Sequence, residues 1–139
     1  MASMNLGSKP TLNLETAKKI AAAAEAEARR NNWNVVISII DDGGNLMYLQ
    51  RLDETQIGSV AIAQEKARCA FLFKRPTKAL EDLVLGGRSV MMALPGVTPV
   101  EGGLPLIFNG HVVGAIGVSG VKSSEDGIIA KAGADLLLS

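Results

Sequence analysis

Residues 100–120, VEGGLPLIFNGHVVGAIGVSG, decide the fold, because they combine six glycines with a strongly apolar background. The alternating side chains predict two strands, over residues 104–108 and 112–119. Between them stand Asn109 and Gly110, the strongest short-range signal for a hairpin turn, since both residue types accept a positive φ angle. The stretch therefore predicts an antiparallel hairpin.

The glycines of the second strand follow the pattern G-x-x-G-x-x-G. A dinucleotide-binding fingerprint needs G-x-G-x-x-G in a turn from strand to helix, and a P-loop needs G-x-x-x-x-G-K-[ST]. Neither pattern occurs. Gly117 lies between Ala115 and Ser119 on one strand face, so that face has little bulk, and we expect a helix, a backbone or a ligand to approach it. We interpret Gly114 and Gly117 as packing residues.

A second hairpin is predicted upstream, over residues 35–40 and 46–51. Its turn, DDGGN at residues 41–45, is rich in the residue types that accept a positive φ angle. Both faces of the first strand are mostly apolar, which predicts a central strand covered on both sides.

Helices are predicted around the two hairpins. Asn13 suits the N-cap of the first helix and Thr77 that of a short third helix, while Ser123 and Asp126 resemble a capping box for the last. Residues 86–99 read as an irregular segment. The predicted helical ranges are 14–30, 58–73, 77–84 and 123 to about 138.

The order of helix, hairpin, helix, irregular loop, hairpin and helix predicts an antiparallel α+β sandwich, whereas a Rossmann unit would alternate strands and helices. With 139 residues the chain has the length of one domain, which we assign to residues 11–139. Residues 1–10 are polar and are predicted to be disordered or left over from cloning.

Composition excludes several function classes. Fourteen basic residues balance fourteen acidic ones, so no overall field attracts nucleic acid or an anionic membrane. No apolar run is long enough for a membrane helix. The single Cys69 and the absence of an apolar signal segment favour the cytoplasm. With only 20% charged residues the chain is apolar for its size, which favours a homo-oligomer.

The candidate chemistry is limited to a few polar residues. Glu101, Gly102 and Gly103 follow a proline-rich loop at the start of a strand, where one carboxylate and several backbone N–H groups can meet a ligand. Lys66 interrupts the apolar stripe of the second helix. Either its ammonium group reaches water at the surface, or it is buried with a partner such as Glu101, Asp41 or an anionic ligand. Arg51 at a strand end can clamp an anion, with Asp53 as its structural partner.

His111 is the only histidine and stands beside the predicted hairpin turn. Exposure to solvent is the simpler interpretation, and haem ligation is the alternative. His111 and Cys69 are too few for a multi-ligand zinc site, and no Ser-His-Asp arrangement is visible. No metal site is predicted.

Three motifs in order, VVISIIDDGGNLMYLQRLD, EKARCAFLFKRPT and EGGLPLIFNGHVVGAIGVSG, resemble the GlcG/HbpS family, which also supplies the C-terminal domain of PduO-type proteins. The likeness extends over about residues 11–138. It implies a profilin-like arrangement, with a five-stranded antiparallel sheet between helices, and assembly into dimers or larger oligomers. Some members are described as haem-binding or haem-degrading, and some accompany glycolate or diol utilisation.

The resemblance makes haem or a related tetrapyrrole the leading ligand. Many relatives carry a histidine where this chain has Asn45, and the alternative iron ligands here are His111 or an oxygen or thioether group such as Met47. The predicted ligand-binding residues are Arg51, Lys66, Glu101, Gly102 and Gly103. Two further functions stay open: a cofactor-independent enzyme on a small carboxylated metabolite, with Lys66 or Glu101 as acid or base, and an accessory or structural subunit of a catabolic pathway.

Overall fold

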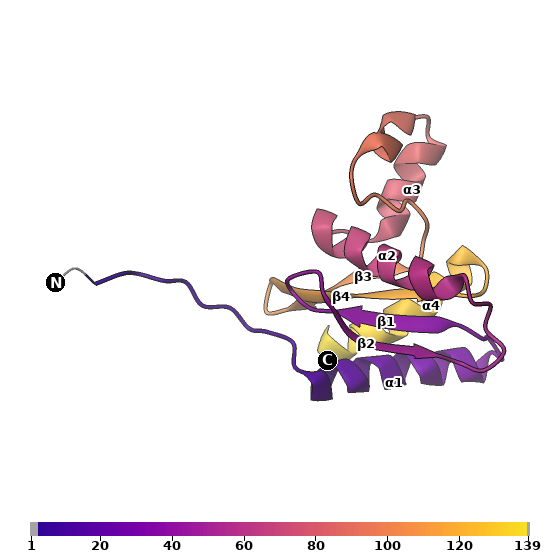
Figure 1. Ribbon diagram of the computed structural model, residues 1–139, viewed down its shortest axis with the longest axis horizontal. Helices are drawn as coiled ribbons and strands as arrows, with labels where there is room; N and C mark the ends of the chain where they lie inside the picture. Colours follow the sequence, from indigo (N-terminus) through magenta and orange to yellow (C-terminus); the bar gives the residue numbers. More distant parts are fainter. Residues whose placement is uncertain (1–2, 139) are drawn as a thin grey trace.

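The computed structural model describes residues 3–138. Residues 1, 2 and 139 lie outside this range, and with them the ends of the predicted N-terminal segment and domain. Residues 3–13 form no regular secondary structure. The first of them extend away from the body (Figure 1), whereas Lys9 pairs with Asp42 and Leu12 packs against the core. The elements are α1 (Leu14–Arg30), β1 (Val36–Ile40), β2 (Leu46–Arg51), α2 (Ser59–Phe73), α3 (Thr77–Leu85), the 3₁₀ helix η1 (Ser89–Ala93), β3 (Gly103–Phe108), β4 (His111–Ser119), α4 (Ser123–Ala134) and the 3₁₀ helix η2 (Asp135–Leu138).

Both predicted hairpins are present, and they join side by side. The strand order is β2-β1-β4-β3, with every neighbouring pair antiparallel. Within residues 3–138 the sheet has four strands, so the prediction of five is wrong. The segment between α3 and β3 contains η1 and irregular chain rather than a strand. The α+β class is confirmed, while the profilin-like arrangement stays a prediction.

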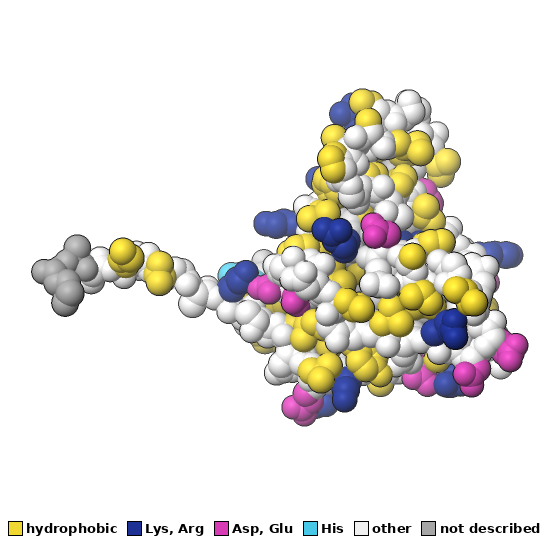
Figure 2. Space-filling model, in the orientation of Figure 1, with side chains coloured by type: hydrophobic (Ala, Val, Ile, Leu, Met, Phe, Trp, Pro, Cys, Tyr) yellow, Lys and Arg dark blue, Asp and Glu magenta, His cyan; other side chains and the backbone are white. Residues whose placement is uncertain are grey.

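The sheet is covered on both faces, as the apolar central strand predicted. Helices α1 and α4 pack together on one face, and α2 crosses the other (Figure 1). All five residues of β1 are buried, which follows from its place between two layers. Helix α3 and η1 project from the body beside α2, and Figure 2 shows hydrophobic side chains over this projection.

The small face of β4 is where α2 approaches. A Cβ atom at Gly117 would overlap the carbonyl oxygen of Ala63 and lie 2.7 Å from the backbone nitrogen of Ala67. The hydroxyl group of Ser38 donates to the same Ala63 oxygen at 2.9 Å. The packing interpretation of Gly117 is therefore confirmed, and a neighbouring helix fills the space that a phosphate group would need.

Local signals predicted the cap of α1 correctly, whereas the caps of α3 and α4 differ from the prediction. Asn13 caps α1 by accepting a hydrogen bond from the Thr16 N–H group at 2.8 Å. At α4 the Glu125 carboxylate accepts a hydrogen bond from the Lys122 N–H group at 3.3 Å, so half of a capping box is present, one residue earlier than the predicted Ser123 and Asp126.

Thr77 is the first residue of α3 rather than its N-cap, which is Pro76. Its hydroxyl oxygen instead accepts a hydrogen bond from the Gly103 N–H group at 2.9 Å. The side chain thus ties α3 to the start of β3. Among the described residues, no helix is long and apolar enough to cross a membrane.

Candidate functional site

The start of β3 is held by bonds from three directions. The Val118 N–H group donates to the Gly102 carbonyl oxygen at 2.9 Å, and Thr77 holds Gly103. The N–H group of Glu101 donates to a carboxylate oxygen of Glu81 at 3.0 Å. Gly102 has a φ angle of +134°, which an L-residue with a side chain rarely adopts. The three predicted residues Glu101, Gly102 and Gly103 are therefore fixed at one place in the fold.

These three residues line a cavity of about 550 Å³, which we call the Glu101 cavity. Its walls come from α3, from the start of β3 and from α4 with the start of η2. Such a volume lies within the usual range for small-molecule sites. The lining residues are Pro76, Lys78, Ala79, Asp82, Glu101, Gly102, Gly103, Leu104, Gly127, Lys131 and Asp135.

The charges of the Glu101 cavity do not balance. Each lysine pairs with an aspartate four residues later in the chain: Lys78 with Asp82 at 3.0 Å and Lys131 with Asp135 at 2.6 Å. The carboxylate of Glu101 makes no ion pair and accepts no hydrogen bond within residues 3–138. Its charge nevertheless acts on Lys78, whose pKa is raised mainly by the hydrogen bond to Asp82 and further by Glu101. Two ammonium groups and three carboxylates leave one net negative charge, which is that of Glu101.

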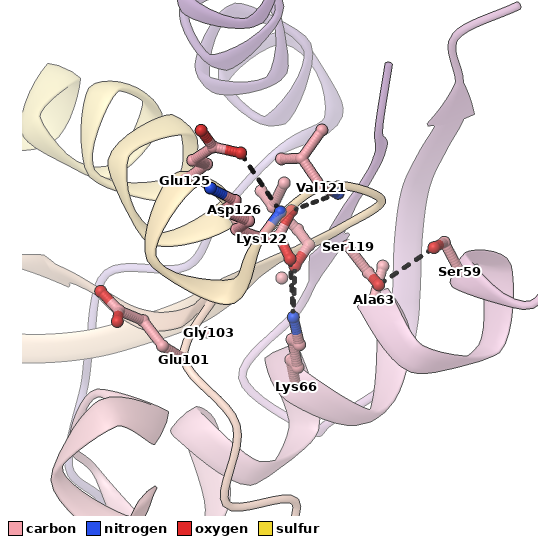
Figure 3. A network of polar contacts seen from close by, with 12 residues as sticks. Ser59, Ala63, Lys66, Glu101, Gly103, Ser119, Val121, Lys122, Glu125 and Asp126 are labelled. Carbon is pink, nitrogen blue, oxygen red and sulfur yellow. Dashed lines mark hydrogen bonds and ion pairs between the residues drawn. The ribbon is translucent and has the colours of Figure 1, made fainter. Parts of the chain in front are cut away.

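Lys66 does not line this cavity. Its side chain is 2% exposed, and its ammonium group donates to Asp126 at 3.1 Å and to the Val118 carbonyl oxygen at 3.0 Å. The prediction of a surface-reaching lysine is wrong, because this side chain lies between α2 and the start of α4. Figure 3 shows Lys66 directed toward Asp126, while Glu101 points away from it. Lys66 is a buried cation whose partner is Asp126, a residue outside the predicted set.

The buried pair influences Asp126 in two opposing ways. Burial raises the pKa of the Asp126 carboxyl group above its ordinary value, and the positive charge of Lys66 acts in the opposite direction. The second oxygen of Asp126 accepts a hydrogen bond from the Val121 N–H group at 3.2 Å. The pair therefore joins α2, the end of β4 and α4 directly behind Gly102, where a Cβ atom would come within 2.8 Å of the Lys66 nitrogen.

Arg51 does not reach the Glu101 cavity either. It ends β2, which is one edge of the sheet, whereas Glu101 precedes β3, which is the other edge. Three strand spacings separate the two edges, about 14 Å. The structure thus brings together only Glu101, Gly102 and Gly103 of the five predicted ligand-binding residues. It adds Lys78 and Lys131, whose regular pairs with acids one helix turn away resemble ordinary surface charges in the sequence.

His111 lines a different cavity, of about 460 Å³, which we call the His111 cavity. It lies at the end of the sheet where β4 begins, beside the β1–β2 turn and the last turn of α2. The His111 imidazole is exposed and makes no hydrogen bond within residues 3–138. The remaining lining residues are Lys9, Asp42, Phe71, Leu72, Lys74, Gly110 and Val112.

Electrostatically the His111 cavity is the opposite of the Glu101 cavity. Lys9 pairs with Asp42 at 2.7 Å, and Lys74 forms no ion pair among the described residues. Two ammonium groups and one carboxylate leave one net positive charge when His111 is neutral. Met47, the other predicted iron ligand, is half-buried on β2 and does not line this cavity.

Comparison with known proteins gives a consistent result over nearly the whole chain. A family model described as haem degrading protein HbpS-like matches residues 12–135. Protein GlcG of Escherichia coli strain K12 is 43% identical over 111 residues, which cover 80% of this chain and 83% of GlcG.

Solved structures are similar in fold as well. A crystal structure of a double mutant of Streptomyces reticuli HbpS superposes with a TM-score of 0.86 at 30% identity, covering 99% of this chain and 95% of that one. A crystal structure of a PduOC:heme complex superposes with a TM-score of 0.80 at 27% identity, covering 90% and 94% of the two chains.

Proposed function

Since this chain belongs to the HbpS-like family, whose model describes haem-degrading proteins, we propose that it binds haem or a related tetrapyrrole, and that it does so in the His111 cavity. One observation carries the choice of cavity: the only histidine of the chain lines it and has a free imidazole. Histidine is a common axial ligand of haem iron. The complex of the structural relative PduOC with haem supports the choice of ligand.

The other side chains of the His111 cavity fit the two ends of a haem. A haem carries two propionate carboxylates on one edge and an apolar ring elsewhere. Lys74, which forms no ion pair among the described residues, supplies an ammonium group for one carboxylate, and Lys9 would serve the second by leaving Asp42. Phe71, Leu72 and Val112 supply apolar contacts. When bound, haem supplies an iron centre whose reactivity the axial ligand helps to set. The turn that holds Asn45, where the family resemblance implies a histidine in many relatives, borders this cavity through Asp42.

The Glu101 cavity fits haem less well. Among its lining residues there is no histidine, cysteine, methionine or tyrosine, and its net charge is negative. A dianionic ligand would face the unpaired carboxylate of Glu101, which costs free energy in a partly desolvated site. The charge difference between the two cavities therefore favours the His111 cavity for haem.

Haemin titration tests this proposal. We expect a saturable shift of the Soret band near one equivalent of haemin, and a weaker or altered band with His111→Ala. Free imidazole added to His111→Ala should restore the band, because it replaces the missing ligand. Lys74→Ala should weaken binding by about two- to fivefold, the usual effect of one exposed ion pair, and Lys19→Ala on α1 serves as the matched control. A wild-type protein that shows no saturable shift would contradict haem binding.

The enzyme alternative needs an accessible acid or base. Lys66 is sealed behind Gly102, and Arg51 lies on the far edge of the sheet, so Glu101 is the one residue of that predicted set in contact with a cavity. Turnover of a small carboxylated metabolite that Glu101→Gln abolishes would support this alternative. If neither binding nor turnover is found, the accessory role gains support. Homo-oligomer formation and a cytoplasmic location stay predictions, and light scattering tests the first.

A further inference from the structure

We propose that the Glu101 cavity is a second ligand site, separate from the haem site, and that it binds a small molecule carrying a primary ammonium group next to an apolar segment. The lining and the charge of this cavity carry the inference. It does not depend on haem binding, because the two cavities share no residue.

The carboxylate of Glu101 is the recognition group. It is half-buried at the cavity wall, yet no cation within residues 3–138 pairs with it. Lys131 pairs with Asp135. Lys78 bonds to Asp82, and only the longer-range attraction of its charge reaches Glu101, without an ion pair. A ligand ammonium group would supply the missing counter-ion through a charge-assisted hydrogen bond, which is stronger than a bond between neutral groups.

Backbone and helix geometry keep this carboxylate at the cavity. The Glu101 side chain lies against Gly127 of α4, where a Cβ atom would collide with one of its carboxylate oxygens. On the other side, the N–H group of Glu101 is fixed by Glu81. Gly127 therefore leaves the space that the carboxylate occupies.

The other lining residues indicate the chemistry of the uncharged part of the ligand. Pro76, Ala79 and Leu104 present aliphatic surface, which suits a short methylene chain. A carboxylate ligand would meet net negative charge unless Lys78 or Lys131 broke its own ion pair. A zwitterion could use one of these lysines, but its ammonium group would still bind Glu101.

Four probes with the same six-carbon chain separate these possibilities: n-hexylamine, hexanoate, 1-hexanol and 6-aminohexanoate, each titrated into the wild-type protein by ¹H–¹⁵N NMR. We expect hexylamine to bind about tenfold or more tightly than hexanol and hexanoate, because only its ammonium group pairs with Glu101. The amides of Gly102, Gly103 and Gly127 should shift, and His111 should not. Comparable affinity of 6-aminohexanoate would place zwitterions among the ligands, whereas weaker affinity would restrict the site to plain amines; both require Glu101.

Two variants and one control fix the role of the carboxylate. Glu101→Gln keeps the shape and should weaken hexylamine binding about tenfold or more. Gly127→Ala keeps the charge but displaces the carboxylate, and it should weaken binding as well. Glu65→Gln on the exposed side of α2 should change nothing. The NMR spectrum of each variant without ligand reports whether the fold is intact.

Removal of a cavity lysine should change the affinity for amines and the affinity for carboxylates in opposite directions. Lys131→Ala should leave hexylamine binding unchanged or stronger, because it removes a like charge. If hexanoate binds as tightly as hexylamine and Lys131→Ala weakens it, the site takes carboxylates and the proposal is wrong. Absence of binding by every probe, or binding unaffected by Glu101→Gln, would also overturn it. None of these outcomes depends on haem. Hexylamine binding measured with His111→Ala therefore tests this proposal separately from haem binding.

Discussion

Lys66→Met should lower the free energy of unfolding by about 3–5 kcal/mol at pH 7, the usual cost of leaving one partner of a buried ion pair without the other. Methionine keeps the length and flexibility of the side chain but removes its positive charge. The Asp126 carboxylate would then be buried without a cation, and the Val118 carbonyl oxygen would lose its 3.0 Å bond to the ammonium group. This penalty is a large fraction of the total stability of a typical domain.

The penalty should depend on pH with a definite sign. Burial raises the pKa of Asp126, and removal of Lys66 takes away the charge that opposes this rise. An acid whose pKa is higher in the folded state binds protons more tightly there, so the folded state gains stability as the pH falls through the raised pKa. The cost of Lys66→Met is therefore greatest near neutrality and decreases toward the ordinary aspartate pKa of 3.8.

Urea denaturation of the wild type and the variant at pH 7 and pH 5 measures both effects. With a slope of about 1.5 kcal/mol per molar urea, the midpoint should fall by about 2–3 M at pH 7. The Lys66→Met/Asp126→Asn double variant retains an oxygen for the Val121 N–H group but has no charge at the pair, so it should be more stable than Lys66→Met at pH 7, and this difference should shrink at pH 5. A Lys66→Met penalty below about 1 kcal/mol, or one that is equal at both pH values, would refute this account of the buried pair.

Two substitutions and one thiol reaction test the packing behind the site. Gly117→Ala should cost about 3 kcal/mol in urea denaturation, because its Cβ atom would overlap a backbone carbonyl of α2, whereas Gly58→Ala, with open space around it, should change the stability by less than about 0.5 kcal/mol. Thr77→Val should cost about 1–3 kcal/mol, since it leaves the buried Gly103 N–H group without an acceptor; a smaller loss would mean that water replaces the hydroxyl group. Cys69 should react with iodoacetamide at pH 8 only as the protein unfolds, because burial raises the pKa of its thiol; alkylation of the folded protein at the rate of a free cysteine would contradict this.

Local signals predicted most of the secondary structure because they act within a few residues. The Asn13 cap and the Asn109-Gly110 turn each depend on neighbours in the sequence, and both stand where expected. The apolar pattern of residues 35–40 likewise predicted a strand covered on both sides. These parts of the fold follow from the sequence directly.

Long-range partners could not be predicted in the same way. Asp126 lies 60 residues after Lys66, and its spacing from Ser123 suggested a capping box instead. The acid that accepts a hydrogen bond from the helix N-terminus is Glu125, which leaves the Asp126 side chain for Lys66 and Val121. No pattern in the sequence distinguishes these two adjacent acids.

The predicted site was divided for a topological reason. Arg51 and Glu101 both stand at ends of predicted strands, but these strands form opposite edges of the sheet. The turn signals of a hairpin do not specify the order of strands from different hairpins. The same topology places His111, at the start of β4, beside the β1–β2 turn and the end of α2. A residue expected at an exposed turn therefore lines a cavity.

The binding of a porphyrin by His111 is the central claim, and the presence of one histidine in the chain makes a direct measurement possible. In protein labelled with ¹⁵N only in histidine, the imidazole nitrogens can be observed while diamagnetic zinc protoporphyrin, which accepts one axial ligand, is added. If His111 is the axial ligand, one of these nitrogen resonances should shift and saturate at one equivalent. Porphyrin binding that leaves both nitrogen resonances in place would contradict it.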